Sequence, residues 1–217
     1  MKSKQSGFTL VEIAIVLVII GLLLGGVLKG QAMIDSAKVK ALANEMKAVQ
    51  TAYNAYQDKF RAIPGDDSIA TTHLGATVNG VTILNPTTNA GNGLIDTVNW
   101  TGAATPVVTN KSSLFWMHTR AAGLMTGDAN NGQGTNSVGG RLGISSTSAI
   151  LPANLAGTRF VCTGGIDGAL AAQLDTMLDD GVGTTGSVQG IVGAAVTTAA
   201  APAAYVNTST YTVCMSF

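Results

Sequence analysis

The sequence predicts an α+β fold, in which a long N-terminal helical spine packs on a C-terminal antiparallel β-sheet domain. Three observations support this prediction. Residues 8–28 form an almost unbroken apolar run, residues 29–60 continue as an amphipathic helical pattern, and residues 61–217 contain short strand and helix candidates between turn residues. One helix followed by several strands is typical of a helix that covers one face of a sheet.

The apolar run is long enough to cross a membrane. From Phe8 to Leu28 every residue is apolar or glycine except Thr9 and Glu12. A helix of that length spans about 32 Å, which matches the hydrocarbon core of a bilayer. Lys2 and Lys4 precede the run, so we expect the N-terminus to stay on the cytoplasmic side.

Two ordinary kinds of apolar segment do not account for this run. A cleavable secretory signal has an apolar region of about 7 to 15 residues before a small-x-small cleavage site, whereas this run is longer and is followed by GGVLKGQAM. A plain membrane anchor fits the length but leaves Glu12 unexplained, because an unpaired acid inside a bilayer is costly.

The stretch KSKQSGFTLVEIAIVLVIIGLLL resembles the class III leader and first helix of type IV pilins and pseudopilins. The pattern of that family is a short basic leader ending in glycine, then Phe-Thr-Leu-(Ile/Val)-Glu, then an unbroken apolar helix. Here the matching residues run from Gly7 to Glu12. The resemblance covers about residues 1–30 and implies a type IV pilin-like fold for the whole chain.

The resemblance implies a defined processing step. A membrane prepilin peptidase would cut between Gly7 and Phe8, remove the leader 1–7 and methylate the new amine of Phe8. The helix 8–28 would stay as the membrane anchor and later form the filament core. Thr9 and Glu12 are the expected assembly residues. A buried carboxylate needs a partner, so we expect Glu12 to pair with the Phe8 amine of a neighbouring subunit and to set the register; the alternative is a Glu12 at the headgroup level.

Four glycines interrupt the apolar helix. Glycine costs about 1 kcal/mol in a water-exposed helix interior, but in membrane helices it permits close packing. Many relatives in the family carry a proline in this part of the helix, and this sequence has none. Local loosening of the helix inside a filament and simple close packing both explain the glycines, which are Gly21, Gly25, Gly26 and Gly30.

Beyond the membrane segment, residues 29–60 show one apolar stripe at alternating spacings of three and four. This spacing predicts that a continuing helix packs on the globular domain with one face, although a coiled coil is possible. The residues Pro64 and Gly65 are expected to end it. The stripe consists of Val39, Leu42, Met46, Val49, Tyr53, Tyr56 and Phe60.

Residues 61–217 predict a globular pilin-like domain of short elements. Residues 61–67, RAIPGDD, form a turn cluster, and residues 78–84 a strand or hairpin. A helix is expected over 112–127 with a serine cap and Gly127 as its end, and a second from a cap at Asp167 to Leu178. In the second helix Leu170, Leu174, Met177 and Leu178 should point inward. Further strands are expected at 160–162, 186–192 and 205–215.

The chain has two cysteines, Cys162 and Cys214. In an exported protein an isolated pair indicates a disulfide; the alternative is two buried thiols in a cytosolic protein. The region 162–214 would then resemble the disulfide-bounded region of pilins that often forms exposed surface. Closing a loop of this length would stabilise the fold by about 4 kcal/mol in the chain-entropy estimate.

Patterns typical of enzymes and cofactor sites are missing from the sequence. The two histidines, His73 and His118, lie in unrelated contexts, and no zinc, redox or phosphate-loop motif is present. We therefore expect no catalytic residue, metal or cofactor. Residues 89–96 and 127–136 resemble calcium loops in composition, but each carries one acid, Asp96 or Asp128. Asp179-Asp180-Gly181 is an equally weak candidate.

The sequence thus predicts a structural subunit of a type IV pilus-like filament. Its expected partners are a prepilin peptidase, an inner-membrane assembly platform and further copies of itself. The precursor would reside in the bacterial inner membrane, and the product in a periplasmic or surface filament. Two alternatives are a pseudopilin of a type II secretion system and a minor tip pilin with a role in adhesion or DNA uptake.

Twelve basic and twelve acidic side chains cancel, and only 11% of the 217 residues are charged, against about 25% in ordinary soluble domains. The chain therefore has no net positive charge with which to attract a nucleic acid. The low charge also weakens repulsion between copies, which suits a subunit that associates.

Overall fold

The computed structural model describes residues 9–96, 100–146, 152–153, 155–195 and 200–217. The chain falls into two compact units, one up to Lys38 and one from Val39 to Phe217. The fold is α+β, with a long N-terminal helix and an antiparallel sheet, as the sequence predicts.

The first helix, α1, runs from Leu10 to Phe60 without interruption. The segment contains no proline, so nothing in it removes a backbone donor. The helix ends where Arg61 adopts a positive φ of 55°, while the Arg61 N–H still donates to the carbonyl of Gln57 at 2.8 Å. Pro64 follows three residues later, in agreement with a helix end in this region.

From Val39 onward, α1 buries the predicted stripe. Six of its seven members are at most 2% exposed, and Phe60 alone is only partly buried. Its ring stacks on His73, with centroids 5.4 Å apart. The buried members are Val39, Leu42, Met46, Val49, Tyr53 and Tyr56.

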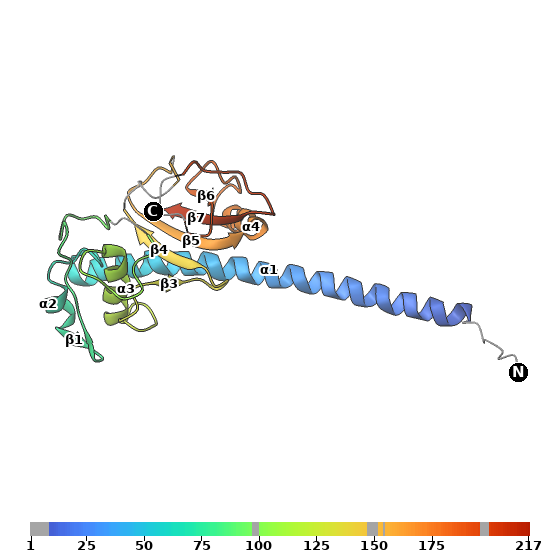
Figure 1. Cartoon of the computed structure of the whole chain (residues 1–217), viewed down its shortest axis with the longest axis horizontal. Coiled ribbons are helices and arrows are strands. Elements are labelled where there is room, and N and C mark those ends of the chain that lie inside the picture. The colour runs from blue at the N-terminus through green and yellow to red at the C-terminus, as the bar shows by residue number, and fades with distance from the viewer. Residues whose placement is uncertain (1–8, 97–99, 147–151, 154, 196–199) are drawn as a thin grey trace, which may run out of the picture. The chain divides into compact units, whose positions relative to one another are not determined.

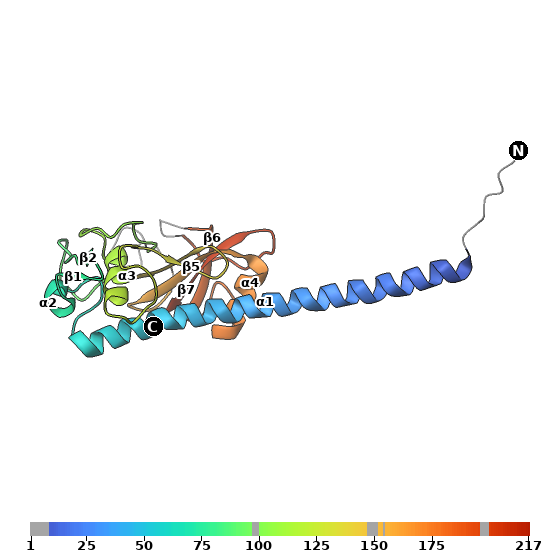
Figure 2. The ribbon, with the colours of Figure 1, turned by 90° about the horizontal axis from the view of Figure 1, so that it is seen from below.

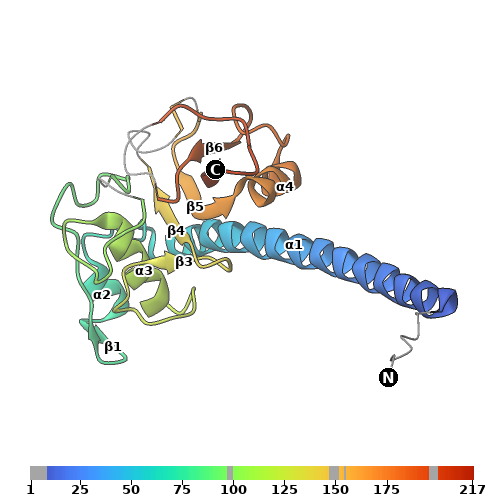
Figure 3. The ribbon, with the colours of Figure 1, turned by 45° about the vertical axis from the view of Figure 1, so that its right-hand side comes forward.

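The main sheet has five antiparallel strands in the order β3-β4-β5-β7-β6. In Figures 1 and 3 the strands lie along the part of α1 that belongs to the same unit. Side chains of this part of α1 share one core with the sheet, including Leu142, Val161 and Val213. The strands are β3 Gly134–Thr135, β4 Arg141–Ser145, β5 Phe160–Asp167, β6 Val188–Val192 and β7 Thr210–Ser216.

The sequence prediction missed β3 and β4 and placed the end of β5 too early. β3 has only two residues, and β4 carries a glycine in its centre. In β5, Gly164 and Gly165 follow Thr163, and the pairing with β7 shifts register between Thr163 and Ile166. Glycines weaken the strand pattern and mark such irregularities, which is why the sequence signal stopped short there.

The remaining elements lie around the end of α1 and beside the sheet (Figure 2). α3 begins at Lys111, one residue before the predicted start, and its cap is Asn110, whose side chain accepts from the Ser113 N–H. The predicted serine cap was therefore wrong. The elements are α2 Ala70–Leu74, β1 Thr77–Val78, β2 Val81–Thr82, α3 Lys111–Ala121 and α4 Gly168–Leu178.

α4 follows the prediction at its start. The Asp167 side chain accepts from the Leu170 N–H at 3.0 Å, which makes it the helix cap. Leu170 and Leu174 are buried as expected, but Met177 is 45% exposed, so its predicted inward position was wrong.

Cys162 and Cys214 form a disulfide. They are directly opposed partners in β5 and β7, and both are buried against Trp100, Leu155 and Phe160. The crosslink therefore joins the central strand β5 to its neighbour β7 and closes a segment that contains α4 and β6.

Candidate functional site

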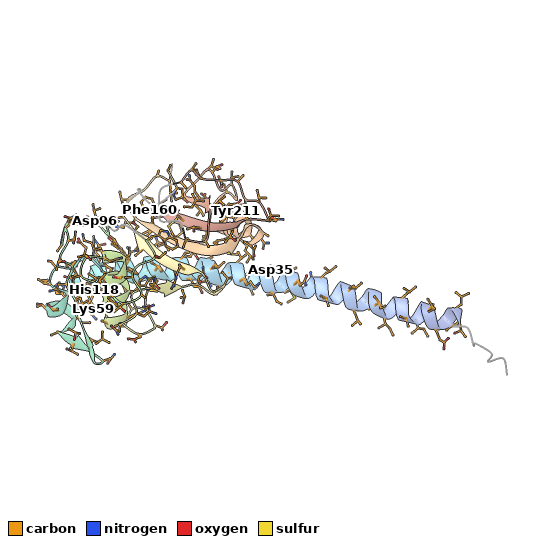
Figure 4. The ribbon with its side chains drawn as sticks, viewed as in Figure 1. Asp35, Lys59, Asp96, His118, Phe160 and Tyr211 are labelled. Carbon is orange, nitrogen blue, oxygen red and sulfur yellow. A yellow bond between two sulfur atoms is a disulfide. The ribbon has the colours of Figure 1, made fainter. Side chains whose placement is uncertain are left out.

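The N-terminal part of α1 exposes its apolar side chains on every face. The side chains drawn along this part lie on both sides of the ribbon (Figure 4). Sixteen large apolar residues there are between 46% and 89% exposed within the single chain. This stretch is long and apolar enough to cross a membrane. The residues are Leu10, Val11, Ile13, Ile15, Val16, Leu17, Val18, Ile19, Ile20, Leu22, Leu23, Leu24, Val27, Leu28, Met33 and Ile34.

Packing within the described part of the chain does not require the glycines of this segment. A Cβ added at Gly21, Gly25, Gly26 or Gly30 would meet no atom within 4 Å, and the helix is regular through all four. Both explanations drawn from the sequence, local loosening of the helix and close packing against other helices, therefore stay open.

Thr9 and Glu12 form a reciprocal cap at the start of α1. The Thr9 N–H and the Thr9 hydroxyl both donate to Glu12 Oε2, at 2.8 and 2.7 Å. In return the Glu12 N–H donates to Thr9 Oγ1 at 3.3 Å. This is the capping box Thr-x-x-Glu. The sequence TLVE contains this motif, but the sequence prediction did not include it. Glu12 therefore has a partner within its own chain, three residues away.

Gly7 and Phe8 lie outside the described residues. The cut between them, the methylation of Phe8 and the pairing of Glu12 with another chain's Phe8 therefore stay predictions.

At the end of α1, two adjacent aspartates of the RAIPGDD turn form separate buried networks. Asp67 Oδ2 accepts from the Tyr56 hydroxyl and lies near His73 Nδ1, both at 2.7 Å. Burial and the hydrogen bond to Asp67 raise the pKa of Tyr56 well above its usual range, so its hydroxyl stays protonated and donates. Asp66 instead faces Lys111, with Asp66 Oδ1 2.7 Å from Lys111 Nζ.

The turn also fixes the position of α3. The Gly65 N–H donates to His118 Nδ1 at 3.0 Å, and His118 Nε2 lies 2.8 Å from the Leu84 carbonyl. Burial lowers the pKa of His118, which favours the neutral ring that this pattern requires, with Nδ1 accepting and Nε2 donating. Gly65 has a φ of 89°, and a Cβ there would lie 2.3 Å from the Lys111 carbonyl oxygen, so no larger residue fits.

The three candidate calcium segments are engaged by the protein's own donors. In residues 89–96, Asp96 Oδ1 contacts Lys111 Nζ at 2.5 Å. In residues 127–136, Asp128 Oδ1 accepts from the Asn130 N–H at 2.8 Å. Asp179 and Asp180 lie close to Asp175, and each of the three accepts from nearby donors, as with the Tyr205 hydroxyl on Asp175 at 2.7 Å.

The comparison with known families bears on the N-terminal segment. Residues 2–28 match the family described as the prokaryotic N-terminal methylation motif. The chain carries the class III prepilin signal of type IV pilins and pseudopilins. No curated protein matches the sequence. The prepilin signal followed by an exposed apolar helix is the pattern of a membrane-anchored precursor.

The structure pairs four of the predicted site residues and shows further interacting residues that were not predicted. Thr9 meets Glu12, and Cys162 meets Cys214. Asp66, Asp67 and Lys111 were not predicted as interacting residues, although RAIPGDD was recognised as a turn. The partners of Asp66 and Lys111 lie far away in sequence, so only the fold could identify them. The partners of Asp67 are nearer, since Tyr56 and His73 lie 11 and 6 residues away on α1 and α2.

Proposed function

We propose that the chain is a structural subunit of a type IV pilus-like filament, made as a prepilin and stored in the bacterial inner membrane. The observation that carries the proposal is a prepilin signal continuous with a helix whose apolar side chains have no partner within the described chain. Such a surface must be covered by lipid or by other subunits, because large exposed apolar areas drive association.

In this proposal the work of the molecule is assembly rather than catalysis. The prepilin peptidase removes residues 1–7 and methylates Phe8. The assembly platform then transfers the helix from the membrane into a bundle with the helices of other copies. Residues 39–217 have a core and a disulfide of their own, so this unit can pass from membrane to filament without refolding.

Processing is tested by the intact mass of the chain extracted from membranes. We expect a protein that begins at Phe8 and carries one methyl group. Gly7→Val should leave the precursor uncut, because the peptidase needs close approach to a backbone without a side chain. Gly21→Ala is the matched control, since a Cβ there meets no atom and cleavage should be normal. A Gly7→Val chain with the mass of the cut form refutes the processing step.

Assembly is tested on filaments sheared from the cell surface. Abundant chain in that fraction, and its helices in the core of a cryo-electron map, are the expected results. The prepilin signal is shared with pseudopilins, so a pseudopilin of a type II secretion system is the alternative function. In that case cells would carry no surface filaments of this chain, and its deletion would abolish protein secretion. Trace amounts within filaments made mostly of another protein would identify a minor subunit.

A further inference from the structure

The ammonium group of Lys111 lies inside a cage of oxygen atoms, here called the Lys111 cage. Lys111 is the first residue of α3, and its side chain is 2% exposed. Five oxygens surround Nζ at 2.5 to 3.0 Å. They are Asp66 Oδ1, Asp96 Oδ1, Asn92 Oδ1 and the carbonyl oxygens of Asn89 and Leu94.

The cage offers more oxygens and more charge than an ammonium group requires. A lysine has three N–H donors, whereas five oxygens lie within contact distance. It carries one positive charge, whereas Asp66 and Asp96 supply two negative charges. Two carboxylates, a side-chain amide oxygen and two backbone carbonyls are the ligands that calcium takes in proteins, where it binds 6 to 8 oxygens.

The oxygens of the cage are held in place by contacts that do not involve Lys111. Asp66 Oδ1 accepts from the Gly91 N–H at 2.9 Å, and Asp66 Oδ2 from the Gly93 N–H at 2.7 Å. Asp96 Oδ2 accepts from the side-chain amides of Asn89 and Asn92, at 2.8 and 3.0 Å. The loop thus wraps around the cation in the manner of a metal-binding loop.

We propose that the Lys111 ammonium takes the place of a metal ion in the loop 89–96, so that this loop folds without calcium. It follows that shortening Lys111 uncovers a site for a hard divalent cation, with Ca²⁺ as the expected ligand. This explains why residues 89–96 resemble a calcium loop in composition: they do bind a cation, but the cation is the ammonium group of Lys111.

The first test compares melting temperatures of the full chain in detergent, in EDTA and in excess Ca²⁺. The wild-type Tm should be the same in both. Lys111→Ala should melt at least about 6 °C lower in EDTA, because two buried carboxylates lose their cation. Ca²⁺ should restore at least half of that loss. Combining Lys111→Ala with Asp96→Asn should abolish the restoration, because a carboxylate ligand is gone.

Two results of this test would overturn the proposal. One is a Lys111→Ala protein whose Tm is the same with and without Ca²⁺. The other is a lower Tm of the wild-type protein in EDTA that disappears in Asp96→Asn. Such a result would mean that a metal ion already occupies the cage of the wild-type protein. If Lys111→Ala does not fold in EDTA, it is refolded with Ca²⁺: recovery of the native circular dichroism supports the proposal, and failure contradicts it.

A local measurement separates the cage from general stability. Hydrogen exchange at the Gly91 and Gly93 amides reports directly on the loop, because both donate to Asp66. In Lys111→Ala these amides should lose protection in EDTA and regain it with Ca²⁺. A covalent bond at Lys111 would refute an ionic cage. It would appear in a peptide digest as Lys111 joined to the peptide that holds Asn92 or Asp96, with the loss of one ammonia or one water; we expect separate peptides of unchanged mass.

Discussion

The two parts of α1 belong to one continuous helix but differ in what covers them. In residues 10–38 the apolar side chains occupy every face, and the large ones are exposed. In residues 39–60 the apolar side chains form one stripe, which is buried against the sheet, α3 and α4. An apolar stripe finds its partner within the chain, whereas a helix that is apolar all round needs a partner outside it.

The two parts of α1 therefore bury their apolar side chains in different ways. Residues 39–217 bury their own core and gain stability by removing apolar surface from water. Residues 10–38 gain nothing comparable until lipid or another subunit covers them. Mutations in the two parts should therefore act on different measurements: those in residues 10–38 on assembly, and those in residues 39–60 on the stability of the second unit.

The largest effect is expected at Glu12, and it concerns assembly rather than folding. If the charge of Glu12 pairs with the Phe8 amine of a neighbouring subunit, both Glu12→Ala and Glu12→Gln should lose filaments or the methylation of Phe8. Cleavage should proceed in both variants. The two variants differ in the cap, because glutamine can also complete the Thr9 capping box. The yield of sheared filaments and the mass of the membrane form are the measurements.

The comparison of the two Glu12 variants decides between two roles. If Glu12→Gln assembles normally while Glu12→Ala does not, the cap is the function of the residue and the pairing between chains is refuted. Asp58→Asn is the control: it removes an acid from the exposed face of the second part of the same helix, and it should leave both cleavage and assembly unchanged.

The second prediction compares one core residue with one exposed residue of the same helix. Met46 is fully buried, whereas Ile19 is 51% exposed. Met46→Ala should lower the free energy of unfolding by about 2–5 kcal/mol, through lost burial and a cavity. Ile19→Ala should change it by less than about 0.5 kcal/mol. Both tryptophans, Trp100 and Trp116, lie in the second unit, so their fluorescence in detergent follows its unfolding alone.

A loss of stability in Ile19→Ala equal to that in Met46→Ala would contradict the division between the two parts. The yield of filaments can be measured for the same two variants. If Met46→Ala still folds, Ile19→Ala should reduce the yield more than Met46→Ala does. Ile19 would then act on packing between copies, which Met46, enclosed within its own unit, does not touch.

The sequence predicted those features that depend on neighbours along the chain. The stripe from Val39 to Tyr56 follows from helical periodicity, and the cap at Asp167 from its place before a helical run. The Thr9 and Glu12 capping box was equally readable, because three residues separate the pair, but it was not used. β4 escaped prediction because the glycine at its centre weakens the strand pattern.

The Lys111 cage could not have been predicted in the same way. Its oxygens come from the turn after α1 and from residues 89–96, and its cation comes from the start of α3. The sequence showed residues 89–96 as calcium-like in composition, but it gave no reason to single out Lys111. Only the fold brings the two together, because the contacts span between 15 and 45 residues of chain.

The smallest effect is expected at the last turns of α1, where the helix joins the RAIPGDD turn. Tyr56→Phe removes the hydroxyl that donates to Asp67 at 2.7 Å and leaves a buried carboxylate with one donor fewer. We expect a loss of about 1–3 kcal/mol, measured by denaturant unfolding. Thr51→Val also deletes a hydroxyl from α1, but that group is exposed and bonds to its own helix, so a loss below about 0.5 kcal/mol is expected. Equal losses in the two variants would mean that Tyr56 contributes through its ring alone, and that α1 and the turn are joined by packing rather than by the buried Asp67.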